Sequence, residues 1–453
     1  MTDRFFSYQP NIPGRGILAS YTPSFWALVV AIGIFSGLAG AALMELLHLI
    51  QHIAFGYSSG NYLAAVEHRP GARRLIALAI AGVIAGAGAL LLRRIRGIGG
   101  GEVSESVWLE EGRMSFRLAN ARGILSIIIV GIGASIGREA APQLAGASFA
   151  SVICERAGIK PWQRKLLVAC GAGAGMAAVY NIPLGGALFA VEVLLGTVAL
   201  PLVIPAILCC LLATATAWIA LPLAPTYHLP VYPIHAQEII WAAIIGPLAG
   251  LAAAAWVKLV AAAHEARPPG RLGRALAPLL ALAALGAIAI AYPQLLGNGK
   301  DTVQLAVTAQ LGITLLLALA ILKPLVTAAC LGSGAPGGLF TPTLTYGVLF
   351  GGLLGRLWSY AWPGSSAGAY ALIGGAAVLA ASMQGPLAAS VMMLELTRFS
   401  DTLMVPILLA LTGATVVVRR LGLPSIYSAR LGEGHSAKAP AAQAVEPVAE
   451  GIP

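Results

Sequence analysis

The sequence has few charged residues, and this scarcity decides the class of protein. Of its 453 residues only 10% are charged, whereas 58% are hydrophobic, and the mean hydropathy is +0.83. Soluble domains carry about 25% charged residues. The composition therefore excludes an ordinary soluble protein. It predicts an all-α polytopic membrane protein, because helices of about 20 apolar residues cross a bilayer.

Cysteine is also scarce, and its positions argue against disulfides and metal. All five cysteines lie within apolar stretches, where free thiols behave as small hydrophobic side chains: Cys154, Cys170, Cys209, Cys210 and Cys330. Glu45, His48 and His52 would share one helix face, but no HExxH pattern accompanies them. A polar interfacial end of the first helix is the favoured interpretation. We therefore expect neither a metal nor a cofactor.

Basic residues outnumber acidic ones, giving a formal net charge of +10. No aromatic-interleaved basic face is present, so nucleic acid is not an expected partner. The basic residues flank apolar stretches, as the positive-inside rule describes, and we expect both tails to be cytoplasmic. The N-terminus has no pattern of a cleaved signal peptide. The clusters are Arg73 and Arg74; Arg93, Arg94 and Arg96; Arg267, Arg271 and Arg274; and Arg419, Arg420 and Arg430.

Glycine and proline interrupt the apolar sequence at four places, residues 131–143, 171–187, 332–342 and 374–390. Irregular backbone at membrane depth is tolerated only where it is buried in protein or lines a water-filled cavity. The four breaks therefore predict a site within the membrane, formed by broken and re-entrant helices.

An internal repeat relates two of these breaks. GAGAGMAAVYNIPLGGALFAVEV matches GGAAVLAASMQGPLAASVMMLEL at a constant offset, so that Pro183 corresponds to Pro386 and Glu192 to Glu395. The repeat predicts two related halves, which we expect to be inverted, with the site at their interface. The expected organisation is a tail over 1–23, halves over 24–224 and 241–427, a connecting segment over 225–240, and a disordered tail over 428–453.

The stretch GSGAPGGLFTP has the design of an anion site. Gly338 leaves the amides of Leu339 and Phe340 uncovered at the start of a helix, where the helix dipole favours negative charge. Taken alone, the stretch is equally compatible with a turn that lets two helices pack.

The presence of Glu139 favours an anion site over a turn that only lets two helices pack. A carboxylate at membrane depth is costly and marks function by default. Beside donors suited to anions, it can occupy the anion's place and leave when protonated. The alternative is a permanent salt bridge to Arg138. Glu192 and Glu395 also lie in apolar helices, but their matching positions favour a structural role as acceptors of backbone N–H groups.

Two further features have weaker interpretations. Residues 133–137 match G-x-S-x-G and would fit an intramembrane serine hydrolase, but none of the seven histidines lies in the broken helices. That function is a remote alternative. Lys323 is either a fixed positive charge or a partner for a glutamate.

These motifs resemble the CLC family of chloride channels and chloride/proton antiporters. LGSGAPGGLFTP is similar to the family's G-x-F-x-P region, IGREAAP to its G-R-E-G-P gate, and LPSIYSARL to its C-terminal tyrosine segment. The resemblance implies that Glu139 is the gating glutamate, that the amides of Leu339 and Phe340 bind chloride, and that Tyr427 donates its hydroxyl to the central chloride. It also implies a homodimer with one pore in each subunit.

The sequence departs from the family pattern at three places. Ala140 and Ala141 follow the gating glutamate, which puts the proline one position later. The family's G-S-G-I-P stretch is replaced by IRGIGGGEVSES, so Gly99 and Gly100 would serve only through their amides. The internal glutamate of proton-coupled members is replaced by Val193, as in the family's channels. These features are similar to the bacterial ClcB-like branch.

The sequence therefore predicts a voltage-gated-type chloride channel of a bacterial inner membrane, with chloride as the substrate and Glu139 as the gate. A chloride/proton antiporter is the alternative. Other halides or nitrate are further candidate substrates. The predicted pore is lined by Gly137, Arg138, Gly99 and Gly100.

Overall fold

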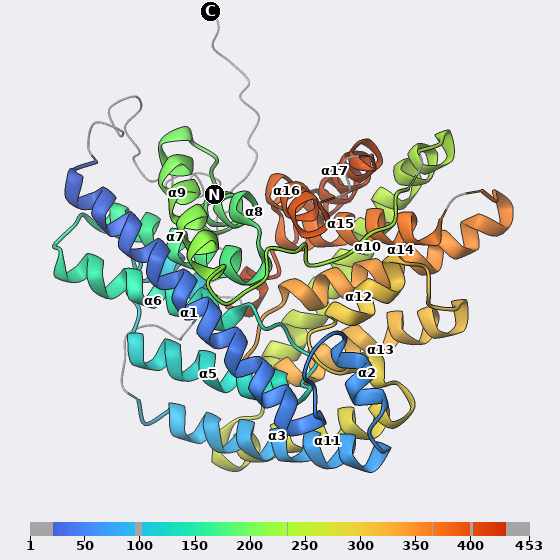
Figure 1. Ribbon diagram of the computed structural model, residues 1–453, viewed down its shortest axis with the longest axis horizontal. Helices are drawn as coiled ribbons and strands as arrows, with labels where there is room; N and C mark the ends of the chain where they lie inside the picture. Colours follow the sequence, from blue (N-terminus) through green and yellow to red (C-terminus); the bar gives the residue numbers. More distant parts are fainter. Residues whose placement is uncertain (1–20, 96–101, 233, 365, 399–401, 432–453) are drawn as a thin grey trace, which may run out of the picture.

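The computed structural model describes residues 21–95, 102–232, 234–364, 366–398 and 402–431. Within these ranges the chain forms helices and one isolated β-bridge, without a strand (Figure 1). Among the described residues, six helices are long and apolar enough to cross a membrane. They are α1 (Pro23–Phe55), α3 (Gly71–Leu92), α9 (Leu200–Ala217), α10 (Ala236–Glu265), α11 (Gly270–Ala291) and α13 (Ile313–Gly332). The predicted all-α polytopic fold is confirmed.

The remaining helices are divided between the two halves of the chain. The first half adds α2 (Tyr62–Glu67), α4 (Val103–Leu109), α5 (Phe116–Ile132), α6 (Ala140–Arg156), α7 (Pro161–Tyr180) and α8 (Pro183–Leu188), which continues as the π-helix η2 (Phe189–Leu194). The second half adds α12 (Lys300–Val307), α14 (Phe340–Ala361), α15 (Ala367–Met383), α16 (Pro386–Thr397) and α17 (Met404–Arg420). Two short 3₁₀ helices are η3 (Pro293–Leu295) and η4 (Ser428–Arg430).

Helix packing in the first half is repeated in the second. Helix α1 packs against α9 as α10 packs against α17, α6 against α7 as α14 against α15, and α7 against α9 as α15 against α17. Helices α3 and α11 pack along each other and lie side by side at one end of the molecule (Figure 1). The two related halves predicted from the sequence repeat are confirmed.

Two of the four predicted breaks are shorter than expected. Helix α7 continues to Tyr180 and ends at Asn181 with φ +58°, and α15 ends at Gln384 with φ +55°. The glycines before these residues lie within the helices, where the absence of a side chain lets a neighbouring helix pack closely. A Cβ added to Gly175 would lie 2.0 Å from the carbonyl oxygen of Pro142 in α6. The prediction of breaks over all of 171–187 and 374–390 is therefore wrong.

The halves are joined by the segment between α9 and α10, which overlaps the predicted connecting segment 225–240. Within it, the backbone N–H of Tyr227 donates to the carbonyl oxygen of Leu396 in α16 at 2.9 Å. The predicted tails lie almost entirely outside the described residues, and so does the predicted disorder after residue 431.

One basic cluster departs from the positive-inside pattern. Arg73 and Arg74 lie at the start of α3, whereas Arg93 and Arg94 follow its other end, so a spanning α3 places the two clusters on opposite sides. Arg74 is buried and donates to the carbonyl oxygens at the end of α11, at 3.1 Å to Ala289 and 3.2 Å to Ile290. Its charge complements a helix C-terminus. The positive-inside interpretation is therefore wrong for the Arg73–Arg74 cluster.

Candidate anion site

The breaks between α5 and α6 and between α13 and α14 meet inside the molecule. Gly137 and Gly338 form an antiparallel β-bridge, in which each N–H donates to the other residue's carbonyl oxygen at 2.8 Å. The bridge lies next to the first residues of α6 and α14. It therefore brings the glutamate of one half to the helix N-terminus of the other half.

Glu139 is almost completely buried, with 1% of its surface exposed. Its Oε1 accepts a hydrogen bond from the backbone N–H of Phe340 at 2.7 Å. Its Oε2 accepts from the hydroxyl groups of Tyr180 at 3.1 Å and Thr341 at 3.3 Å. These donors and the dipole of α14 stabilise a charge that burial would otherwise make costly. The carboxylate thus accepts the hydrogen bond of the Phe340 N–H, one of the two backbone amides predicted to bind chloride.

The two glycines of the bridge lie directly against this carboxylate. A Cβ added to Gly137 would lie 2.0 Å from Oε1 of Glu139, and one added to Gly338 would lie 2.1 Å from the same atom. Such distances are far inside van der Waals contact. Any side chain at either position would force the carboxylate to move.

Arg138 contacts Tyr180 and does not pair with Glu139. Its guanidinium lies over the ring of Tyr180, 5.1 Å from the ring centroid, in a cation–π contact. In the described part of the chain, no ion pair joins Arg138 to Glu139. The glutamate is therefore held by hydrogen bonds and not by the salt bridge that was the alternative.

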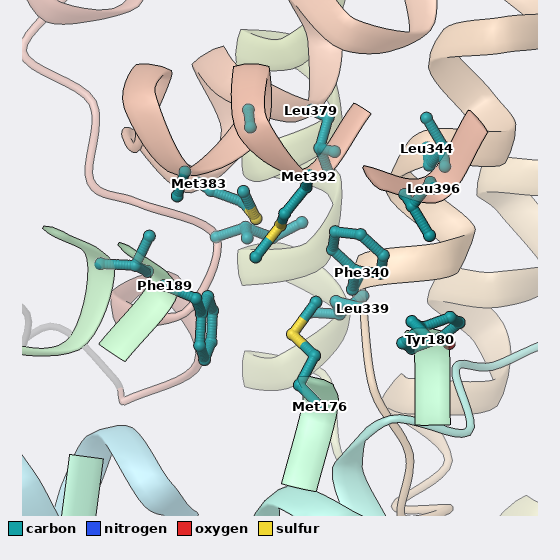
Figure 2. Close-up of a cluster of buried hydrophobic side chains, with 14 of the residues drawn as sticks. Met176, Tyr180, Phe189, Leu339, Phe340, Leu344, Leu379, Met383, Met392 and Leu396 are labelled. Carbon is teal, nitrogen blue, oxygen red and sulfur yellow. The ribbon is translucent and has the colours of Figure 1, made fainter. Parts of the chain in front are cut away.

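Apolar side chains surround the start of α14. Leu339 and Phe340 are each 1% exposed and lie among buried methionines, with Met176 and Met392 on facing elements (Figure 2). The rings of Tyr180 and Phe340 lie 5.5 Å apart. Because these side chains exclude water, the N–H dipoles at the helix start act in a medium of low dielectric constant.

Tyr427 lies on a narrow cavity that reaches Glu139. The cavity has a volume of ≈ 30 Å³ and is lined by Glu139, Gly338, Leu339 and Tyr427, together with residues of α4, α6, η2 and η4. The ring of Tyr427 lies edge-on to Phe189, with centroids 5.6 Å apart. Its hydroxyl lies 3.8 Å from the sulfur of Met383. Four of the predicted site residues therefore line one cavity, and a fifth, Phe340, is joined to them by its hydrogen bond to Glu139.

The described residues among those predicted to line the pore are not on this cavity. Neither Gly137 nor Arg138 lines the cavity. Gly99 and Gly100 lie outside the described residues.

Sequence reasoning missed four residues of the site. Tyr180 and Thr341 donate to Glu139, and Glu102 and Arg430 line the cavity. Thr341 directly follows Phe340, and Tyr180 ends the repeated helix, so a search for hydroxyl donors near the breaks would have found both. Nothing in the sequence connects Glu102 with Arg430.

Glu192 and Glu395 accept backbone hydrogen bonds, as predicted. Glu192 accepts from the N–H groups of Leu387 at 3.1 Å and Ala388 at 2.5 Å. Glu395 accepts from those of Leu184 at 3.0 Å and Gly185 at 2.6 Å. Their predicted structural role is confirmed.

The weaker sequence features have ordinary structural partners. The hydroxyl of Ser135 lies 3.3 Å from that of Thr327, and no histidine of the described residues bonds to it. Lys323 donates to the carbonyl oxygens of Leu295 and Gly297 at 3.0 Å each, so it is not paired with a glutamate. His52 bonds the carbonyl oxygen of Tyr57. The described residues contain no cluster of three or more histidine, cysteine or acidic side chains able to hold a metal.

A comparison with known families agrees with these features. A family model described as voltage gated chloride channel matches residues 81–419. The chain belongs to the CLC family. This CLC protein is 33% identical over 429 residues to the voltage-gated ClC-type chloride channel ClcB of Salmonella typhimurium, covering 90% of this chain and 100% of that protein. It is 30% identical over 423 residues to ClcB of Citrobacter koseri, with the same coverage.

Solved structures show the CLC fold independently. A slow cyanobacterial Cl⁻/H⁺ antiporter matches with a TM-score of 0.76 at 20% identity, covering 90% of this chain and 97% of that one. A CLC-type fluoride/proton antiporter matches with a TM-score of 0.70 at 19% identity and the same coverage. At these identities the likeness concerns the fold alone.

Proposed function

We propose that this CLC protein is a chloride channel gated by Glu139. One observation carries the proposal: Oε1 of Glu139 accepts the N–H of Phe340 at 2.7 Å, at the N-terminus of α14. That N–H is a donor of the kind that binds anions at helix starts. The carboxylate and a chloride ion therefore compete for the same donor.

Protonation opens the pore in this mechanism. A neutral carboxyl group is a weaker acceptor than a carboxylate, so protonated Glu139 leaves the amide of Phe340 to chloride. Chloride then loses water against the amides of Leu339 and Phe340, with the hydroxyl of Tyr427 as a further donor. Movement of charge through the membrane field supplies about 2.3 kcal/mol per elementary charge per 100 mV, which makes such a gate sensitive to voltage.

Val193 supports a channel over an antiporter. It lies in η2 with 6% of its surface exposed and its side chain against Gly385, so it provides no proton acceptor. Glu102 is a second carboxylate on the cavity. Burial raises its pKa, but the guanidinium groups of Arg430 and Arg122 lower it further and leave it below its usual range. Glu102 therefore remains charged at neutral pH and is a poor proton carrier.

Chloride/proton exchange is the second candidate. The cyanobacterial structure that this fold matches is a Cl⁻/H⁺ antiporter. In that case water or another side chain would carry the proton past Val193.

Coupled flux measurements separate the two candidates. Purified protein in liposomes with a chloride gradient is followed for chloride and external pH together, under a clamped potential. Chloride flux without uphill proton movement is expected for a channel. Uphill proton movement at a fixed ratio to chloride would establish the antiporter. Repeating the assay with bromide, fluoride and nitrate measures selectivity.

The proposal includes a bacterial inner membrane, cytoplasmic tails and a homodimer. The mass of the protein in detergent, measured by light scattering, tests the dimer. A monomeric mass at micromolar concentration would contradict it.

A further inference from the structure

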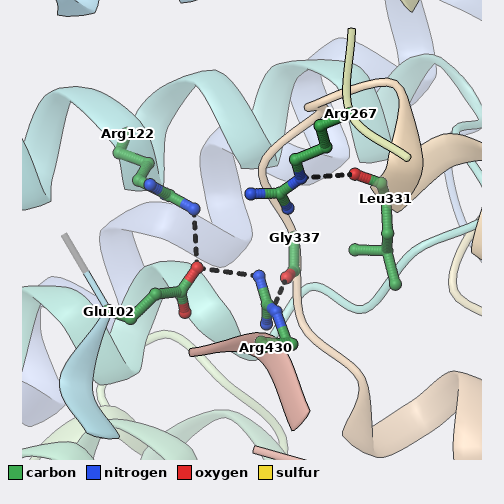
Figure 3. A network of polar contacts seen from close by, with 6 residues as sticks. All are labelled: Glu102, Arg122, Arg267, Leu331, Gly337 and Arg430. Atoms are coloured by element: carbon green, nitrogen blue, oxygen red, sulfur yellow. Dashed lines mark hydrogen bonds and ion pairs between the residues drawn. The ribbon is translucent and has the colours of Figure 1, made fainter. Parts of the chain in front are cut away.

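Two arginines share one oxygen of Glu102 beside the proposed pore. Glu102 is the N-cap residue of α4, and its Oε1 accepts from Nη2 of Arg122 at 2.6 Å and from Nη2 of Arg430 at 2.7 Å (Figure 3). The side chains of Glu102 and Arg430 are 25% and 7% exposed. The cluster therefore combines three helical elements, α4, α5 and η4, around one carboxylate.

Arg430 connects this cluster to the anion site. It follows Tyr427 by three residues in η4 and lines the same cavity as Tyr427, Leu339 and Glu139. Its Nη1 also lies 3.5 Å from the carbonyl oxygen of Gly337, next to the glycine of the β-bridge. A chloride ion in the cavity therefore lies near a guanidinium as well as near the amides of α14.

Arginine side chains outnumber carboxylates around Glu102 and the cavity. Arg267 lies beside the pair in Figure 3 and donates to the carbonyl oxygen of Leu331 at 3.2 Å. Burial, together with Arg430 and Arg122, lowers the pKa of Arg267 to about 10, so it is charged at neutral pH. Three guanidinium groups thus lie around Glu102, and with Glu139 on the same cavity they outnumber the carboxylates by three to two. Such a surplus attracts a small anion into a narrow cavity.

Glu102 has the same relation to Arg430 that Glu139 has to Phe340. In each case a side-chain carboxylate accepts a hydrogen bond from a donor that could otherwise bind a free anion. Both carboxylates line the same cavity. Ser104 also lines the cavity, and Arg430 adds a charged donor to it.

We propose that the guanidinium of Arg430 is an anion-binding site of the pore and that Glu102 is its built-in competitor. Chloride entering the cavity replaces Glu102 at Arg430, while Arg122 retains the displaced carboxylate. The inference rests on the proposed chloride pathway. A side-chain guanidinium sets the anion affinity at this end of the cavity.

Bromide binding to the full-length protein tests the site. Crystals of the wild type and of Glu102→Gln are soaked in bromide, and anomalous scattering locates the ion. Titration calorimetry measures bromide affinity in detergent. Glu102→Gln removes the competing charge, so we expect a bromide peak within hydrogen-bond distance of Arg430 and an affinity about tenfold higher. Arg430→Gln is expected to lose that peak.

Glu111→Gln is the matched control, because Glu111 pairs with Arg164 at 3.8 Å and does not line the cavity. It should leave bromide affinity unchanged. If the Glu102–Arg430 pair only held η4 against α4, Glu102→Gln would lower thermal stability without a bromide peak at Arg430 or a gain in affinity, and the inference would be overturned. Wild-type chloride flux is measured separately in liposomes. Chloride flux in the wild type, together with no bromide peak at Arg430 in Glu102→Gln, would overturn this inference alone. Absence of chloride flux in the wild type would overturn the proposed function.

Discussion

Glu192 and Glu395 cap each other's helices. The carboxylate of Glu192, in the first half, accepts the N–H groups at the start of α16, and that of Glu395, within α16, accepts those at the start of α8. This exchange is the pattern that a two-fold relation between the halves produces. Each helix begins with a proline, Pro183 or Pro386, followed by N–H groups that lack a partner within the helix. The other half supplies that partner.

Removing either carboxylate should destabilise the protein by a similar amount. We expect Glu192→Ala and Glu395→Ala each to lower the free energy of unfolding by about 1–2 kcal/mol, since each leaves two helix N–H groups without their acceptor. Thermal unfolding in detergent measures this loss. Glu155→Ala, at an exposed position of α6, is the control. A loss confined to one of the two variants would contradict the reciprocal arrangement.

Glu139→Gln should make chloride flux nearly independent of pH. The amide is neutral at every pH and competes weakly with chloride for the N–H of Phe340. Wild-type flux should rise on acidification, whereas flux through the variant should already be high at neutral pH. Liposome flux between pH 4 and pH 8 is the measurement, with Glu155→Gln as the control. A steep pH dependence in Glu139→Gln would exclude this residue as the gate.

Tyr180→Phe should shift the pH dependence of flux toward higher pH. The variant loses the hydroxyl that donates to Oε2 of Glu139 at 3.1 Å, so the charged carboxylate is held less firmly. Loss of one such bond corresponds to a shift of about one pH unit in the midpoint of flux. Tyr360→Phe, at a residue that is 78% exposed, should not move the midpoint. A shift toward lower pH would contradict the role of Tyr180 as a donor.

Tyr427→Phe should weaken halide binding while flux is retained. The phenol hydroxyl is one donor among several on the cavity, so its loss should raise the Kd for chloride about fivefold. Titration calorimetry gives the Kd and liposome assays give the flux. Tyr346→Phe is a control on α14, where the ring packs near Trp256. Unaltered affinity in Tyr427→Phe would remove this residue from the site.

Glu102 should contribute to stability at neutral pH and lose that contribution in acid. Its pKa in the folded protein lies below the usual value because Arg430 and Arg122 outweigh the effect of burial. A depressed carboxyl pKa stabilises the folded state above the pKa of the unfolded chain, about 4.3, and the contribution falls as pH falls through the folded value. The difference in Tm between wild type and Glu102→Gln should therefore narrow below pH 4. A difference that widened in acid would contradict the ion pair.

The sequence was informative where local chemistry decides the structure. The fold class followed from composition, the two halves from the repeat, and the contact between Glu139 and an uncovered amide from the cost of a buried charge beside a helix start. The extents of two breaks were wrong because small residues serve equally for breaking a helix and for packing one closely. The Glu102–Arg430 pair and the buried Arg74 depend on elements far apart in the chain. No local pattern brings such residues together.

The β-bridge between Gly137 and Gly338 joins the two halves, so neither half of the chain forms the proposed gate alone. The carboxylate belongs to the first half, and the N–H that it occupies belongs to the second. If the chain were divided between α9 and α10, the first fragment would keep a buried acid without its principal donor. The second fragment would keep the N–H of Phe340 without that acceptor. The contact between the carboxylate and the N–H of Phe340 thus exists only where the two halves assemble.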